Sequence, residues 1–142
     1  MTRQIIIYGG SGGIGGALAR RLSARGDRVH LVARDRERLT SLAEEMDAGF
    51  TVGDVTDPDL FTRVADEAGD FCDGLVYAVG TINLRSLQRL TEDDFLTEFR
   101  VNALGAALRS TANRRLRRAC LSANSGDTET RWAVGSSKRC SR

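Results

Sequence analysis

The residues with the clearest chemical meaning are glycines near the start of the chain, where residues 9–15 read Gly-Gly-Ser-Gly-Gly-Ile-Gly. A phosphate can approach a backbone closely only where side chains are absent, and the first turn of a helix offers unpaired amides and a partial positive charge. This segment therefore predicts a turn that binds the phosphates of a dinucleotide, and a plain glycine turn is the alternative. The residues expected to contact the ligand are Gly9, Ser11, Gly13, Ile14 and Gly15.

A strand and an amphipathic helix must hold this turn in place. Residues 4–8 form an apolar, β-branched run that predicts a buried strand, and Ile14, Leu18 and Leu22 recur at helical spacing after the glycines. The alternation continues along the chain. Further strands are expected over 29–33, 50–52 and 75–79, and helices over 36–46, from Asp57 and Pro58 onward, and over 91–108. Asp57 is expected to cap its helix with Pro58 in the first turn, and Thr91 with Asp94 resembles a capping box. This order predicts an α/β fold of Rossmann type, a doubly wound parallel sheet with helices on both faces.

The alternating pattern stops after the predicted 91–108 helix. From Arg109 onward the chain carries 9 of the 21 basic and 2 of the 19 acidic residues, and little in it resembles a buried strand. We therefore expect a dinucleotide-binding region over 1–108, truncated after about the fourth strand with the fifth-strand region absent. The basic tail over 109–142 is expected to be irregular or translated out of frame. Nucleic-acid binding by this tail is not favoured, because it holds one aromatic residue, Trp132, and no recognised motif.

The glycine spacing, Gly-x-x-x-Gly-x-Gly, resembles that of the short-chain dehydrogenase/reductase (SDR) family, and the resemblance runs to about Leu108, the N-terminal cofactor-binding half. It implies that Asp54 and Val55, after the third strand, contact the adenine. It also implies a contact from Gly80 after the fourth strand. Residues 77–80 read Tyr-Ala-Val-Gly where the family has Asn-Asn-Ala-Gly, so the contact there is expected from backbone groups.

The end of the second strand predicts which dinucleotide is preferred. An acidic residue at this point binds the ribose hydroxyls of NAD, whereas a basic residue pairs with the additional phosphate of NADP. Ala33 stands where the family has its NAD-selecting acid, and Arg34 follows it. Because a guanidinium forms charge-assisted bonds to phosphate, NADP(H) is the expected cofactor, with NAD(H) also able to bind. Asp35 can still reach a ribose hydroxyl, and a solvated loop arginine is the alternative for Arg34.

Catalysis is the part of the function for which residues are missing. In the family, an asparagine in a segment resembling residues 101–105 belongs to the catalytic set, which makes Asn102 its counterpart. The alternative is an amide that binds neighbouring backbone groups. The family's reaction also needs an upstream serine and Tyr-x-x-x-Lys, and neither tyrosine here is followed four places on by the sole lysine, Lys138. We expect this chain to be inactive alone.

Composition narrows the remaining classes. With 41% hydrophobic and 28% charged residues, the chain is typical of a globular domain, and its first apolar run is too short for a membrane span or a signal peptide. Three scattered cysteines and the lone His30 favour neither a disulfide framework nor a metal site. The sequence thus predicts a cytoplasmic protein, and the SDR resemblance implies an oxidoreductase that acts on a small carbonyl or alcohol. Self-association through the 91–108 helix is also expected. A non-enzymatic nucleotide-binding or interaction module is the alternative.

Overall fold

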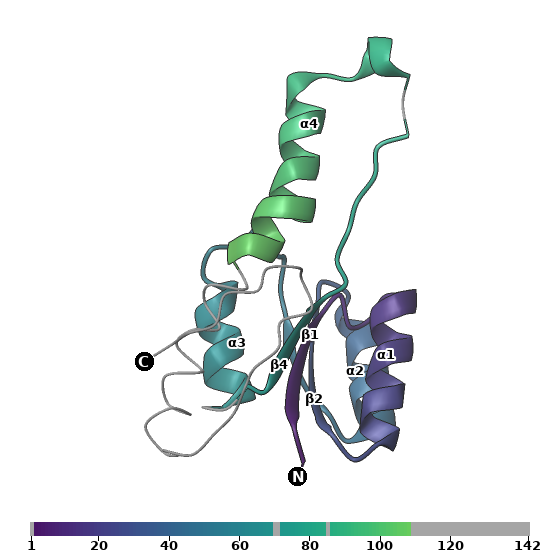
Figure 1. Ribbon diagram of the computed structural model, residues 1–142, viewed down its shortest axis with the longest axis vertical. Coiled ribbons are helices and arrows are strands. Elements are labelled where there is room, and N and C mark those ends of the chain that lie inside the picture. Colours follow the sequence, from purple (N-terminus) through teal and green to yellow (C-terminus); the bar gives the residue numbers. More distant parts are fainter. Residues whose placement is uncertain (1, 70–71, 85, 109–142) are drawn as a thin grey trace, which may run out of the picture.

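The centre of the fold is a four-stranded parallel sheet, seen in Figure 1. The computed structural model describes residues 2–69, 72–84 and 86–108. The strands are β1 (Gln4–Tyr8), β2 (Arg28–Ala33), β3 (Gly49–Val52) and β4 (Gly74–Tyr77), in the order β3-β2-β1-β4. All three neighbouring pairs are parallel. The predicted Rossmann-type α/β class is therefore confirmed, while the predicted tail over 109–142 lies outside the described residues.

Helices cover both faces of this sheet, which explains why β1 is apolar without alternation. On one face, α1 (Gly13–Ala24) and α2 (Arg36–Met46) pack over Ile5, Ile7 and Leu31, and α3 (Leu60–Ala68) lies on the other (Figure 1). The second core layer consists of Ile6, Tyr8, Val32, Val55, Leu60, Val64 and Cys72. Successive strand residues point to opposite faces, so a strand buried on both sides needs an apolar residue at every position.

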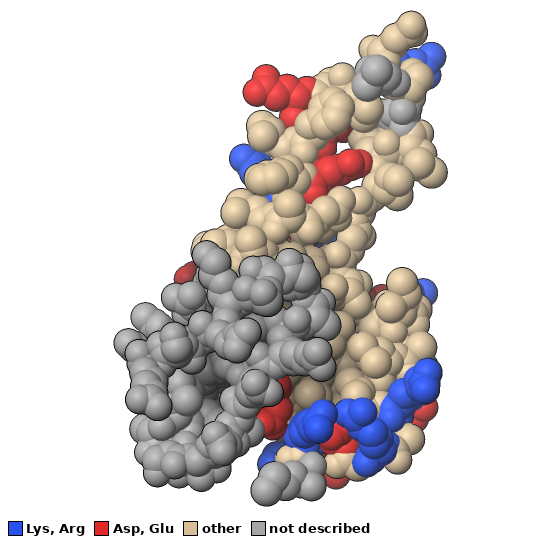
Figure 2. Space-filling model, viewed as in Figure 1, with Lys and Arg blue, Asp and Glu red and all other residues tan. Residues whose placement is uncertain are grey.

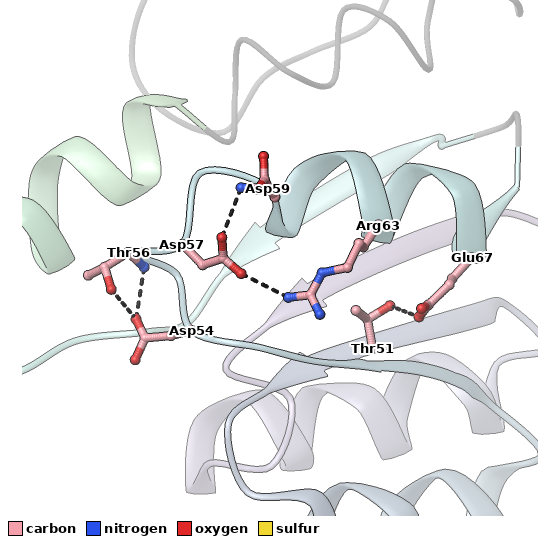
Figure 3. A network of polar contacts seen from close by, with 7 residues as sticks. All are labelled: Thr51, Asp54, Thr56, Asp57, Asp59, Arg63 and Glu67. Carbon is pink, nitrogen blue, oxygen red and sulfur yellow. Dashed lines mark hydrogen bonds and ion pairs between the residues drawn. The ribbon is translucent and has the colours of Figure 1, made fainter.

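Helix α3 begins later than the sequence indicated. Asp57 and Pro58 were expected as its cap and first turn, but they form the turn before it, and the cap position is held by Asp59. The expected capping position is wrong because the Asp57 carboxylate serves the turn itself. It accepts from the Asp59 amide at 2.9 Å and from the Arg63 guanidinium at 3.0 Å (Figure 3). Strand β4 likewise ends at Tyr77, two residues before the predicted end.

The segment after β4 leaves the sheet and returns as a helical arm (Figure 1). A short 3₁₀ turn, η1 (Leu87–Arg89), precedes α4 (Glu92–Phe99), which begins at the predicted capping box of Thr91 and Asp94. The predicted helix over 91–108 is interrupted by a π-helical turn, η2 (Arg100–Leu104), before helical backbone resumes over 105–108. In Figure 2 this arm stands apart from the sheet layer, and most of its surface there is neither acidic nor basic.

Candidate functional site

A cavity of about 790 Å³ lies at the carboxyl edge of the sheet, where the loops after all four strands meet. We call it the edge cleft. This is the edge at which parallel α/β sheets bind their ligands. Six residues expected from the sequence to contact a dinucleotide line it, namely Gly9, Ser11, Arg34, Asp54, Val55 and Gly80. The cleft therefore brings together most of the predicted binding residues from four separate stretches of the chain.

Two of the glycines in the turn after β1 are required by its packing. Gly9 has a φ of +82°, and a Cβ there would lie 2.5 Å from the Ala78 carbonyl oxygen. At Gly15 a Cβ would lie 2.2 Å from the Gly9 carbonyl oxygen. The amides of Gly9 and Gly10 donate to the Val32 carbonyl oxygen at 2.8 and 3.1 Å, which ties the turn to β2. These contacts allow the first helix to start directly behind β1.

Gly12 and Gly13 have a different role, because they are exposed and lie at the start of α1. A Cβ at Gly13 would meet no atom within 4 Å. Gly12 holds the cap position of α1, and no side chain caps the amides that follow it. A bare, uncapped helix start fits the phosphates of a dinucleotide. Gly13, Ile14 and Gly15 are not among the residues that line the edge cleft; Gly13 and Ile14 face solvent beside it and Gly15 is buried.

At the other end of the cleft, Arg34 and Asp54 face each other. Their closest atoms, Arg34 Nη1 and Asp54 Oδ2, are 3.6 Å apart, and the Arg34 side chain is 81% exposed. Asp54 also accepts from the Thr56 amide at 2.8 Å and from the Thr56 hydroxyl at 2.7 Å (Figure 3). These hydrogen bonds, with a smaller contribution from the Arg34 charge, lower the pKa of Asp54. Asp54 is therefore ionised at neutral pH and available as an acceptor.

A second arginine of the cleft, Arg38, was not singled out from the sequence. It lies in the first turn of α2 and lines the same cavity as Arg34. Asp35 caps that helix by accepting from the Arg38 amide at 3.1 Å, and its other oxygen lies 3.6 Å from the Arg38 guanidinium. The signal that could have found Arg38 is its position three residues after the cap, which places it on the same side of α2 as the cap.

The asparagine predicted as a catalytic remnant sits in the π-helical turn. Asn102 Oδ1 accepts from the Thr81 amide at 2.8 Å, and its Nδ2 donates to the Thr81 carbonyl oxygen at 2.7 Å. The amide thus satisfies neighbouring backbone groups, as the alternative reading of the sequence proposed. Thr81 lines the edge cleft, together with Thr97 and Val101 of the helical arm, which the sequence did not indicate. A catalytic role for Asn102 stays a prediction.

A buried polar group lies away from the cleft, between β2, β3 and α3. His30 Nε2 is 2.8 Å from the Thr51 hydroxyl, which in turn donates to the Glu67 carboxylate (Figure 3 shows the second contact). Because the single hydroxyl proton goes to Glu67, the Thr51 oxygen accepts from a protonated Nε2. Burial lowers the pKa of His30. His30 therefore belongs to the core.

Two further features concern metals and membranes. Within the described ranges, no three His, Cys, Asp or Glu side chains are grouped closely enough to hold a metal ion. No helix of that same part of the chain is long and apolar enough to cross a membrane.

Known proteins resemble this chain in sequence and in structure. A family model described as short chain dehydrogenase matches residues 3–118. A 3-dehydrosphinganine reductase of Arabidopsis thaliana is 32% identical over 111 residues, covering 74% of this chain and 34% of that protein. Carbonyl reductase family member 4 of Danio rerio is 30% identical over 114 residues, covering 76% and 48%. The crystal structure of BdcA in complex with NADPH has a TM-score of 0.71 and 30% identity, covering 80% and 47%.

Proposed function

Because the chain belongs to the short chain dehydrogenase family, we propose that its edge cleft binds NADP(H) in preference to NAD(H). The observation that carries this preference is a pair of arginines, Arg34 directly after β2 and Arg38 in the first turn of α2, which both line the cleft. Each is now paired with a carboxylate at 3.6 Å, a distance at which exposed pairs are worth little. Both guanidinium groups are therefore free to turn towards a phosphate on the adenosine ribose.

The rest of the cleft supports the same ligand. In a Rossmann sheet the dinucleotide crosses the carboxyl edge with its pyrophosphate at the first helix. The uncapped start of α1 suits that group, while Asp54 and Val55 suit the adenine half, and the backbone at Gly80 suits the nicotinamide half. The bound cofactor supplies or accepts a hydride in this family's chemistry, and the described residues bind and orient it.

We propose further that the oxidoreductase to which this cofactor-binding region belongs exchanges hydride with a small carbonyl or alcohol, while these 142 residues are inactive alone. The relatives that carry this expectation are a 3-dehydrosphinganine reductase and a carbonyl reductase family member. The chain spans about a third to a half of the length of these relatives. Its 142 residues hold no Tyr-x-x-x-Lys, the pair that handles the proton in the family's reaction. The second candidate function is a non-enzymatic nucleotide-binding module built on the same cleft, because the cleft residues named above are all assigned to the dinucleotide.

Calorimetric titration of the full chain with NADPH and with NADH tests the cofactor assignment. We expect NADPH to bind more tightly by about tenfold to a hundredfold, which is the range for one or two charge-assisted contacts. Equal affinities would refute the NADP preference while leaving dinucleotide binding intact. No binding of either cofactor would refute the proposed function as a whole.

A second copy of this chain is the proposed partner of the helical arm. Phe95 and Phe99 of α4 are 56% and 59% exposed, and Leu108, in the helical backbone after η2, is 46% exposed. Exposed large apolar side chains of this kind mark an interaction surface. Sedimentation of the full chain should show a dimer or larger species, and Phe99→Glu should shift it to monomer. Ile82→Glu is a matched control, because Ile82 is 73% exposed but lies in the loop before the arm. A monomeric unsubstituted chain would contradict this proposal.

The cytoplasmic location also stays a proposal, which cell fractionation tests.

A further inference from the structure

Tyr77 connects the central sheet to the helical arm. It is the last residue of β4, and its ring packs against that of Tyr8 with centroids 6.2 Å apart. Its hydroxyl donates to the Val101 carbonyl oxygen at 2.5 Å. This tyrosine stands at the first position of the Tyr-Ala-Val-Gly segment, where the sequence departs from the family's Asn-Asn-Ala-Gly. The contact is therefore a feature of this chain that the family pattern does not supply.

The hydroxyl meets a carbonyl whose α-helical bond is missing. In an α-helix the Gly105 amide would donate to the Val101 carbonyl, four residues earlier. In the π-helical turn η2 it donates to the Arg100 carbonyl, five residues earlier. The Val101 oxygen is thereby left for the Tyr77 hydroxyl. A π-helical turn needs such compensation, because a carbonyl without a partner is costly in a partly buried place.

Gly105 completes the arrangement. A Cβ at this position would lie 2.2 Å from the Tyr77 hydroxyl oxygen and 3.1 Å from Cζ of the same ring. Only a residue without a side chain lets the helix approach the ring this closely. Tyr77 and Gly105 are thus complementary: the hydroxyl occupies the space that any side chain at 105 would take.

The turn held in this way forms part of the edge cleft. Val101 lines the cavity. The next residue, Asn102, forms hydrogen bonds with both the amide and the carbonyl oxygen of Thr81, and Thr81 lines the cavity as well. We propose that Tyr77 is a positioning residue: its hydroxyl fixes η2 and, through it, the wall of the cleft beyond β4. This inference rests on the proposed cofactor, whose nicotinamide half would lie against that wall. The competing explanation is that the Tyr77 ring only fills the core beside Tyr8.

Tyr77→Phe separates the two explanations, because it keeps the ring and removes the hydroxyl. If Tyr77 positions the wall, affinity for NADPH should fall about threefold to tenfold, the value of one neutral hydrogen bond. Affinity for adenosine 2′,5′-bisphosphate should stay within about twofold, since that fragment contacts the Arg34 and Asp54 end. An equal loss for both ligands, or no loss for either, would overturn the positioning role and leave the cofactor assignment standing. If the unsubstituted chain binds neither ligand, the proposed function is refuted and the positioning role falls with it.

A double-mutant cycle in urea tests the contact without any ligand. Gly105→Ala should lower the unfolding midpoint strongly in the unsubstituted chain, because the new Cβ meets the hydroxyl. Combined with Tyr77→Phe, the same change should lower the midpoint by less than half as much. If the two substitutions change the unfolding midpoint additively, the Tyr77 hydroxyl does not occupy the space beside Gly105, and the inference is overturned.

Discussion

Replacing Gly13 with valine is expected to abolish dinucleotide binding while leaving the fold in place. A Cβ at Gly13 meets nothing within 4 Å, and the residue is exposed, so the free energy of unfolding should change by no more than about 0.5 kcal/mol. The branched side chain would instead stand over the uncapped start of α1. Losing two amide-to-phosphate bonds at about 1.5 to 3 kcal/mol each should weaken NADPH binding at least about a hundredfold.

The matched control for this substitution is Gly15→Ala in the same turn. Its Cβ would lie 2.2 Å from the Gly9 carbonyl oxygen and 2.8 Å from the Gly9 carbonyl carbon, so the backbone must shift. Overpacking of this kind costs about 1 to 3 kcal/mol of unfolding free energy. Urea denaturation and calorimetric titration of both variants give the two quantities. Unchanged NADPH binding by Gly13→Val would refute the assignment of the turn after β1 to the phosphates. If Gly13→Val loses binding only because it unfolds, the expectation that a side chain at residue 13 leaves the fold intact is refuted.

Three further predictions concern cofactor choice, pH and turnover. Arg34→Ala should weaken NADPH binding about tenfold and leave NADH binding unchanged. This is the lower end for a charge-assisted contact, because the Arg34 side chain is 81% exposed. Arg38→Ala should act in the same direction, and calorimetric titration of both variants checks this. Because burial lowers the pKa of His30 in the folded chain, its contribution to stability is complete above the unfolded pKa of about 6.5 and is lost as the pH falls below that value. Urea midpoints should therefore drop between pH 7 and pH 5, and should be flatter in His30→Gln; identical pH profiles would contradict this assignment. The full chain should not oxidise NADPH with a panel of aldehydes and ketones, since a positioned acid contributes about a hundredfold to ten-thousandfold and none is identified; turnover that Gly13→Val removes would show that another group supplies the proton.

The parts of the fold that the sequence predicted well are those set by local pattern. Helix α2 has the predicted bounds of Arg36 to Met46, and Thr91 with Asp94 forms the predicted capping box. The predicted buried strand at the start is β1, one of the two inner strands of the sheet. These elements are each determined by residues close together in the sequence, so the local pattern alone is enough to predict them.

The parts that it missed depend on contacts between distant segments. The π-helical turn is compensated by the Tyr77 hydroxyl, 24 residues before Val101, and no local pattern indicates such a pairing. Thr97 and Val101 line the edge cleft only because the helical arm returns to the carboxyl edge of the sheet. The turn at Asp57 depends on Arg63, six residues later. Tertiary contacts of this kind override propensity, and they decide which side chains complete the candidate site.

The most direct test of the account is a heteronuclear NMR titration of the full chain with NADPH. If the edge cleft holds the dinucleotide, saturable shifts should concentrate in the amides of Gly9 to Gly15, of Ala33 to Asp35 and of Gly53 to Val55. Amides on the opposite edge of the sheet, such as those of Arg28 and Gly74, should not move. Spectra unchanged at millimolar NADPH, or saturable shifts confined to residues outside the cleft, would contradict the central claim that this edge of the sheet is a dinucleotide site.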